Sequence, residues 1–108
     1  MADVEQLLFD LHVYSGSGYG YFLTCDAVRL RLARGEDWEP SLKALQREVA
    51  KQRACSYEGF VKLIRRISEI AWERNPTLLK TLAHMDLECA PKPQEFIDII
   101  YTYILRNK

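Results

Sequence analysis

The sequence predicts an all-α protein, a single six-helix domain, and three observations support that prediction. Apolar residues recur every three or four positions along most of the chain, which is the spacing of one helix face. No segment shows a convincing strand pattern, and glycine, proline and asparagine punctuate the helical spacing. The chain has 108 residues, of which 48% are hydrophobic and 28% charged, and this composition suits one folded domain with a modest core.

The first half of the chain is expected to contain two helices joined by a short connection. Leucines at helical spacing predict a first helix over residues 2–13. The segment SGSGYGY, residues 15–21, is too short and too aromatic for a flexible linker, so we interpret it as a tight connection. A second helix over residues 21–34 is expected to end at Gly35, and GEDWEP then forms a loop.

Aromatic residues surround these glycines and suit either base stacking or the filling of a narrow helix crossing. We favour filling. The residues concerned are Tyr14, Tyr19, Tyr21 and Phe22. A phosphate-binding loop is not supported, because no strand precedes SGSGYG and no GK[ST] follows it.

The middle of the chain predicts a helix pair. The first helix, residues 41–53, begins next to Pro40. The second, residues 56–74, begins at Ser56, a residue typical of helix N-caps. The inward residues expected on the pair are Leu42, Leu45 and Val49, and then Phe60, Leu63, Ile64, Ile67, Ile70 and Ala71.

The last third of the chain predicts two more helices. Asn75-Pro76 caps and begins a fifth helix through Leu82. Two prolines in CAPKP, residues 89–93, then require a turn. The sixth helix carries PQEFIDIIYTYIL, with an expected buried stripe of Phe96, Ile97, Ile100, Tyr101 and Ile104.

Charge is balanced overall but unevenly distributed. The 15 basic and 15 acidic residues cancel, so net charge gives no reason to expect binding to nucleic acid or anionic lipid. Residues 47–74, however, hold seven basic and four acidic side chains, whereas residues 1–46 hold four and seven. A local basic patch of this kind is what phosphate contacts require.

Catalysis, cofactors and membrane insertion have little support in the sequence. His12 and His84 have no neighbouring nucleophile or acid in a recognisable arrangement, so we expect no enzyme. The three cysteines show neither a CxxC pair nor zinc-ligand spacing, so we expect reduced thiols and no metal or other cofactor. Neither a signal peptide nor a membrane-spanning apolar run is recognisable, so the expected location is the cytoplasm.

The helix pair at residues 41–74 has the spacing of a helix-turn-helix, with its turn at Ala54-Cys55. At 100° per residue, Lys62 and Arg66 lie almost opposite Ile64 on the second helix, and Arg65 lies on the flank. These three side chains are therefore expected to face outward.

Two interpretations of this basic face remain open. In the first, it is a solvated surface with ion pairs Glu58–Lys62, Arg65–Glu69 and Arg66–Glu69. In the second, it is a recognition surface for DNA, which is favoured because the basic residues lie in the first half of the helix.

Motifs in a fixed order resemble one known family. These are GY at 20–21, AV at 27–28, VAK at 49–51, Ile64-Arg65 with EIAW at 69–72, and EFI at 95–97. Together they resemble the C-terminal effector domain of the stage 0 sporulation protein A family of response regulators. The resemblance spans nearly the whole chain. It implies a helical helix-turn-helix module that binds operator DNA, with residues 56–74 as the recognition helix.

The resemblance also assigns residue roles and marks departures. Arg65 matches a base-reading arginine of the family, and Lys62 stands where the family carries another arginine. Val61 replaces a glutamate, and Glu58-Gly59 replace a more polar, basic pair. The family's phosphorylated receiver domain is not expected here, because six helices already use all 108 residues.

The sequence therefore predicts a DNA-binding transcriptional regulator related to sporulation control, acting on double-stranded DNA as two copies, in a homodimer or in tandem. Its expected base contacts are Lys62, Arg65 and Arg66, and its expected phosphate contacts are Arg47, Lys51, Arg53 and Ser56. The alternative is a degenerate helix-turn-helix that serves as a protein-interaction module. Trp38, Tyr101 and Tyr103 are candidate anchors for that alternative, although we favour core packing for them.

Overall fold

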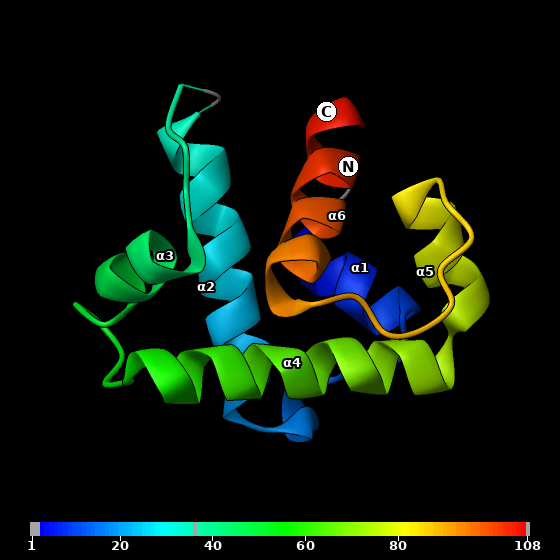
Figure 1. Cartoon of the computed structure of the whole chain (residues 1–108), viewed down its shortest axis with the longest axis horizontal. Helices are drawn as coiled ribbons and strands as arrows, with labels where there is room; N and C mark the ends of the chain where they lie inside the picture. The colour runs from blue at the N-terminus through cyan, green and yellow to red at the C-terminus, as the bar shows by residue number, and fades with distance from the viewer. Residues whose placement is uncertain (1–2, 36, 108) are drawn as a thin grey trace.

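The computed structural model describes residues 3–35 and 37–107, and within those ranges the chain forms six α-helices, one short 3₁₀ turn and no strand (Figure 1). The all-α prediction is confirmed. The elements are α1 (Val4–Asp10), η1 (Ser15–Ser17), α2 (Tyr19–Arg34), α3 (Leu42–Val49), α4 (Tyr57–Arg74), α5 (Pro76–Ala83) and α6 (Pro93–Arg106). Met1, Ala2, Glu36 and Lys108 lie outside the described residues, and they include one end of the first expected helix and one residue of the GEDWEP loop.

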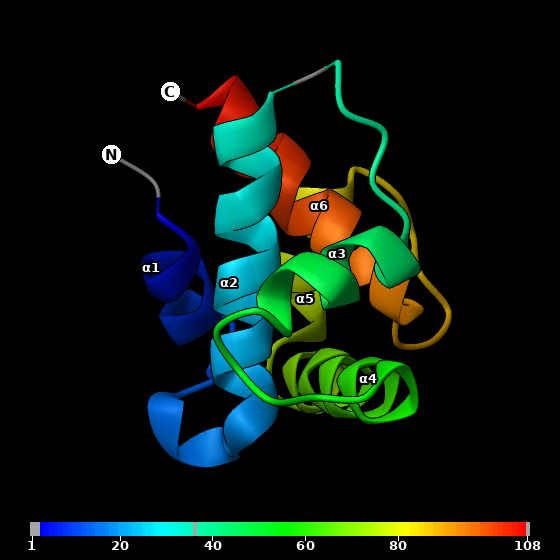
Figure 2. The same ribbon diagram turned by 90° about the vertical axis from the view of Figure 1, so that its left-hand side faces the viewer.

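The longest helix, α4, lies along one side of the molecule, with most of the other helices on its inner side, and η1 and the first turn of α2 extend past it (Figure 1). Helices α2 and α6 pack against each other and stand across α4 (Figure 1). Helix α3 lies near the start of α4, and α5 folds back from its end (Figure 1). A view along α4 shows that the opposite side of this helix has no other helix over it (Figure 2). That side is therefore open for contact with another molecule.

Helices α2 and α4 meet at a glycine. A Cβ atom placed on Gly20 would lie 2.5 Å from the carbonyl oxygen of Leu63 and 3.0 Å from Cγ1 of Ile67. Real Cβ atoms do not approach a backbone oxygen so closely, so the two helix backbones come together only because residue 20 has no side chain. This contact fixes the position of α4 against α2.

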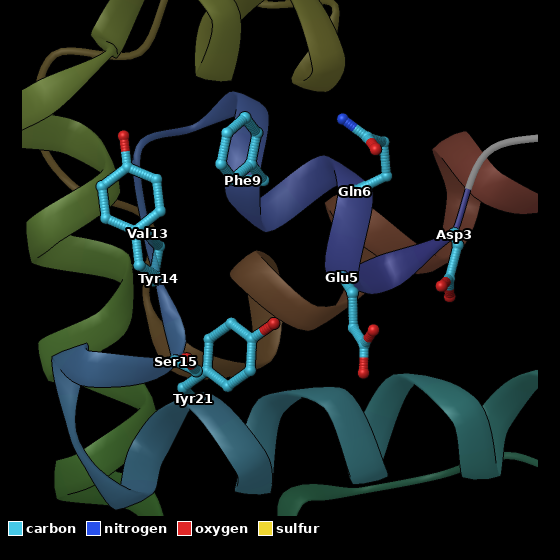
Figure 3. A pocket seen from close by; sticks show the side chains of 8 residues that line it. All are labelled: Asp3, Glu5, Gln6, Phe9, Val13, Tyr14, Ser15 and Tyr21. Carbon is cyan, nitrogen blue, oxygen red and sulfur yellow. The ribbon is translucent and has the colours of Figure 1, made fainter.

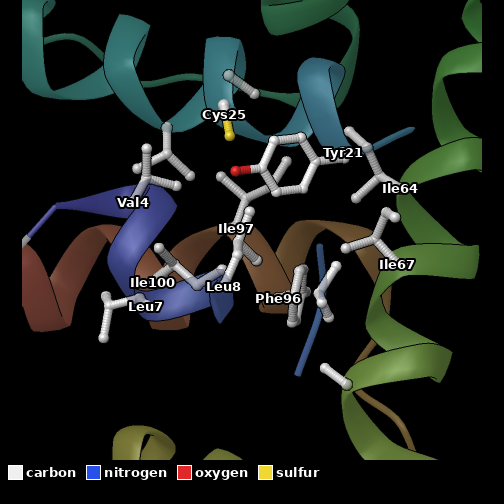
Figure 4. Packing of buried hydrophobic residues seen from close by; sticks show 14 of the residues in the cluster. Val4, Leu7, Leu8, Tyr21, Cys25, Ile64, Ile67, Phe96, Ile97 and Ile100 are labelled. Carbon is white, nitrogen blue, oxygen red and sulfur yellow. The ribbon is translucent and has the colours of Figure 1, made fainter. Parts of the chain in front are cut away.

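The core is a continuous apolar cluster to which each described α-helix contributes. Figure 4 shows the part of it where side chains of α1, α2, α4 and α6 meet. Its largest fully buried side chains include Phe60, Ile64 and Phe96, and burial of each such side chain contributes roughly 1.5–3 kcal/mol to folding. The two buried polar side chains of the described residues are both satisfied. Thr24 Oγ1 donates to the Gly20 carbonyl at 2.8 Å, and Ser68 Oγ donates to the Pro91 carbonyl at 2.7 Å.

Both ends of α4 agree with the prediction. The hydroxyl of Ser56 accepts a hydrogen bond from the Gly59 amide at 3.0 Å, as an N-cap does. At the other end, Asn75 Oδ1 accepts from the Leu78 amide at 3.3 Å, and Pro76 occupies the first position of α5. All the predicted inward residues of α4 are buried except Leu63, which is half-buried.

Three predicted helix boundaries are wrong. Helix α1 ends at Asp10 because His12 adopts a left-handed conformation with φ of 64°. The His12 amide then donates to the Phe9 carbonyl at 2.9 Å, and the Val13 amide donates to the Leu8 carbonyl at 2.8 Å. This is the Schellman arrangement, which usually requires glycine.

The other two differences affect α2 and α3. Helix α2 begins at Tyr19, because Gly18, with φ of 109°, forms its N-terminal boundary. Helix α3 ends at Val49, and residues 50–53 form turns in which the Lys51 amide bonds only three residues back. The connection to α4 therefore spans residues 50–56 and is longer than the three or four residues typical of a helix-turn-helix turn.

The aromatic residues around the glycines do not all fill the helix crossing. Tyr21 is buried, whereas Tyr14, Tyr19 and Phe22 are exposed. The prediction of filling therefore holds for Tyr21 alone, because the crossing itself is made by a glycine.

Candidate nucleic-acid interface

The outward face of α4 carries the three basic residues that the sequence singled out. Lys62, Arg65 and Arg66 are all exposed. They face away from the core because Phe60, Ile64 and Ile67 occupy the opposite side of the helix at full burial. The predicted outward direction of these side chains is confirmed.

Few acidic partners engage this basic face. Within residues 3–35 and 37–107, no carboxylate lies within 4.0 Å of the charged groups of Lys62 or Arg65. Arg66 Nη1 lies 4.0 Å from both Glu69 Oε1 and Glu73 Oε1, with its side chain 58% exposed. Long, exposed pairs of this kind contribute little to stability. Of the three ion pairs expected in the solvated-face interpretation, Arg66–Glu69 is the one that forms among the described residues, and the exposure of the other side chains is compatible with either interpretation.

Helix α3 adds two more cations near the start of α4. Leu45 and Val49 are buried, so Arg47 and Lys43 project from the opposite side of α3, one turn apart. Lys43 Nζ lies 5.8 Å from the ring centroid of Tyr57, the first residue of α4. Sequence reasoning missed Lys43, although its spacing of four residues from Arg47 would have identified it.

The positive charge of Lys51 is paired with a carboxylate of the same fold. Its Nζ lies 3.0 Å from Glu48 Oε2, and Arg34 approaches the same carboxylate at 3.0 Å. The pKa of Glu48 is lowered chiefly by the hydrogen bond from Lys51, with the charge of Arg34 adding to the effect. A phosphate bound by Lys51 would have to compete with this carboxylate.

Arg53 is also engaged. Its Nε donates to Asp26, its guanidinium lies over the ring of Phe22 at 5.3 Å, and its pKa is raised mainly by the hydrogen bond to Asp26. The hydroxyl of Ser56 already accepts the N-cap hydrogen bond from the Gly59 amide, so only its O–H donor is available to a phosphate. Among the predicted phosphate-contacting residues, Arg47 is therefore the most available.

The charged residues are unevenly distributed along the outward face of α4. The cations lie between residues 62 and 66, with the exposed Glu58 in the first turn of the helix and the carboxylates Glu69 and Glu73 in its second half. A polyanion would therefore be attracted to the segment 62–66 and repelled by the carboxylates on either side of it.

The connection between α3 and α4 is held in place by a side chain. Gln46 Nε2 donates to the Cys55 carbonyl at 2.9 Å, so α3 is tied to the residue that precedes the N-cap. Lys43, Arg47 and the first turn of α4 therefore belong to one ordered unit.

The candidate anchors of the protein-interaction alternative are packed rather than free. Tyr101 is buried, and the Arg31 guanidinium covers its ring at 4.0 Å. Trp38 and Tyr103 are half-buried against the core. The preference for core packing is confirmed for these residues.

The described residues assemble no metal-binding cluster. No three His, Cys, Asp or Glu side chains of the described ranges converge as metal ligands. The thiol of Cys25 is buried, and that burial raises its pKa to about 11, which makes it a poor nucleophile. None of the described helices combines the length and the apolar character needed to cross a bilayer.

Known proteins add no assignment to this surface. Comparison of the chain with protein-family models, curated proteins and solved structures gives no match. The resemblance to the stage 0 sporulation protein A effector domain therefore rests on the sequence motifs alone.

Proposed function

We propose that this chain is a DNA-binding transcriptional regulator whose helix α4 enters the major groove of double-stranded DNA. The observation that carries the proposal is the outward face of α4, where Lys62 and Arg65 are exposed and, within the described ranges, lack acidic partners. An arginine in the major groove can donate two hydrogen bonds to O6 and N7 of guanine, and lysine can donate to the same atoms. These residues, with Arg66, are the proposed base contacts.

Helix α3 is proposed to act as the scaffold of a helix-turn-helix. Its Lys43 and Arg47 project beside the start of α4, where a phosphate backbone flanking the groove would pass. Lys51 and Arg53 contribute only by exchanging Glu48 and Asp26 for phosphate.

A single module of this size offers few phosphate contacts, and two copies on adjacent half-sites would supply more. The role in sporulation control follows from the sequence resemblance. The structural support for the proposal is the exposed cationic face of α4, and this face does not identify the operator sequence.

The experiment is a salt titration of binding to a genomic DNA library and to random duplexes. We expect log affinity to fall linearly with log salt concentration, as counterion release requires. Arg65→Ala should cost about 1–3 kcal/mol on selected sequences and less on random DNA. Arg106→Ala removes an exposed arginine from the end of α6 and is the matched control.

Two results would contradict the proposal. Equal losses on selected and random DNA for Arg65→Ala would remove its base-reading role. If the chain binds no DNA even at the lowest salt concentration, DNA is not its ligand and the protein-interaction alternative is favoured.

A further inference from the structure

A groove lies between α1, the η1 segment and the start of α2. It has a volume of about 640 Å³. Figure 3 shows its lining side chains, which come from Asp3, Glu5, Gln6, Phe9, Val13, Tyr14, Ser15 and Tyr21. DNA binding through α4 makes no use of this groove.

One wall of the groove is aromatic and uncovered. Phe9 is 59% exposed and Tyr14 is 42% exposed, and their rings meet edge to face with centroids 5.4 Å apart. Val13 and Tyr21, which lie below them, are buried. Adjacent exposed apolar side chains over a packed floor are typical of a surface that binds another protein.

The rest of the groove is acidic. The side chains of Asp3 and Glu5 are more than half exposed, and the single cation near them in the described ranges is Arg29, whose Nη2 lies 2.9 Å from Glu5 Oε1 and 4.0 Å from Asp3 Oδ1. Two lining carboxylates therefore share one guanidinium, which leaves this end of the groove with an excess of negative charge.

The aromatic wall is held in a fixed geometry. His12 Nδ1 and the Tyr14 hydroxyl are 3.1 Å apart, and this contact links the end of α1 to the η1 segment. Arg74 and Asn75 donate to the carbonyl oxygens of His12 and Asp10, each at 2.9 Å. A ligand would therefore meet a preformed surface and lose little affinity to ordering it.

We propose that this groove binds a peptide segment of a partner protein in which a large apolar side chain stands next to lysine or arginine. The apolar side chain would pack between Phe9 and Tyr14, and the cation would face Asp3 and Glu5. A nucleic acid does not fit, because the carboxylates repel phosphate. The residues that line the groove are not among the DNA contacts proposed for α4.

The test is selection of short random peptides displayed on phage against the full chain. We expect enriched peptides to pair a large apolar residue with lysine or arginine. Backbone NMR shifts on titration with a synthetic enriched peptide should change around Phe9, Tyr14 and Tyr21 and not around Arg65. Phe9→Ser and Asp3→Asn should each weaken binding, Phe9→Ser by about tenfold.

Met85→Ser is the matched control, because Met85 is a similarly exposed apolar residue, at 58%, that does not line the groove. Circular dichroism of each variant checks that the fold is retained. The proposal is overturned if no peptide is enriched, if enriched peptides lack a cation, or if Phe9→Ser binds as well as the parent. It is also overturned if sedimentation shows that the groove is occupied only by a second copy of the chain. Loss of DNA binding in the salt titration would leave all these readouts unchanged, so the two proposals fail separately.

Discussion

The guanidinium of Arg74 donates a hydrogen bond from Nη1 to the main-chain carbonyl oxygen of His12 at 2.9 Å, across 62 residues of sequence. The carbonyl belongs to the turn that ends α1, where helix carbonyls have no partner in the helix. The last residue of α4 therefore satisfies the end of α1.

Arg74→Ala should lower the free energy of unfolding by about 1 kcal/mol, because a charged donor is lost from an exposed acceptor. Urea denaturation measures this change. Arg106→Ala removes an equivalent last-turn arginine from α6 and should cost less. Equal costs would mean that the long-range hydrogen bond adds nothing beyond the general effect of a cation at a helix end.

Gly20→Ala should destabilise the protein by about 1–3 kcal/mol, because its Cβ atom would collide with the Leu63 carbonyl and force α2 and α4 apart. Gly16→Ala is the control, since a Cβ atom at Gly16 meets nothing within 4 Å. Thermal unfolding of the two variants should separate them clearly. Similar melting temperatures would show that the crossing relaxes without cost.

His84→Gly should raise the free energy of unfolding by about 0.5–1 kcal/mol. His84 has φ of 56° at the end of α5, a conformation that costs a residue with a Cβ atom about 1–2 kcal/mol, and part of the gain is lost to the freer unfolded chain. His84→Ala keeps the Cβ atom and should bring no such gain. If alanine stabilises as much as glycine, the histidine ring rather than the backbone is the source of the strain.

Cys25 should make stability fall at alkaline pH. Burial raises its pKa from 9.0 to about 11, and burial also raises the pKa of the neighbouring Tyr21. The folded state therefore keeps the thiol proton where the unfolded state loses it. This stabilisation is complete below pH 9 and is lost as the pH rises to 11, at about 1.4 kcal/mol per pH unit at most.

Urea titrations at pH 8 and pH 11 measure that loss, and Cys25→Ala should reduce it. Cys89→Ala, which removes an exposed thiol, is the matched control. If the free energy of unfolding falls as much at alkaline pH in Cys25→Ala as in the parent, groups other than Cys25 cause the fall.

On the proposed DNA-binding function, Glu73→Gln combined with Glu69→Gln should tighten DNA binding severalfold, because the two carboxylates lie 4.0 Å from Arg66 and also repel phosphate. Fluorescence anisotropy at fixed salt measures the affinity. Glu88→Gln removes an exposed carboxylate elsewhere and should change affinity little. Weaker binding by the double variant would indicate that Glu69 or Glu73 itself contacts a base.

Local signals in the sequence were sufficient to predict α4. Ser56 and Asn75-Pro76 fixed its ends, and the isoleucine spacing identified its buried side, which also set the outward direction of Lys62, Arg65 and Arg66. These features depend on backbone capping and helical period, which act within a few residues.

Other features depended on contacts between distant residues. The sequence pattern places Gly20 in the connection at residues 15–21, because nothing near it in the sequence reveals that the Leu63 main chain needs the space. The pairing of Arg53 with Asp26 was likewise not predictable from spacing, so Arg53 was expected to be free for phosphate. The end of α1 at His12 was missed because a left-handed histidine carries no sequence signal comparable to glycine.

The contact of α4 with α2 at Gly20 uses the main chain of Leu63. The position of α4 against α2 therefore does not depend on the side chains of the outward face of α4. The exposed positions 58, 62, 65 and 66 can be randomised as a set while the register of the helix is preserved, so the domain is a suitable host for selecting new binding preferences.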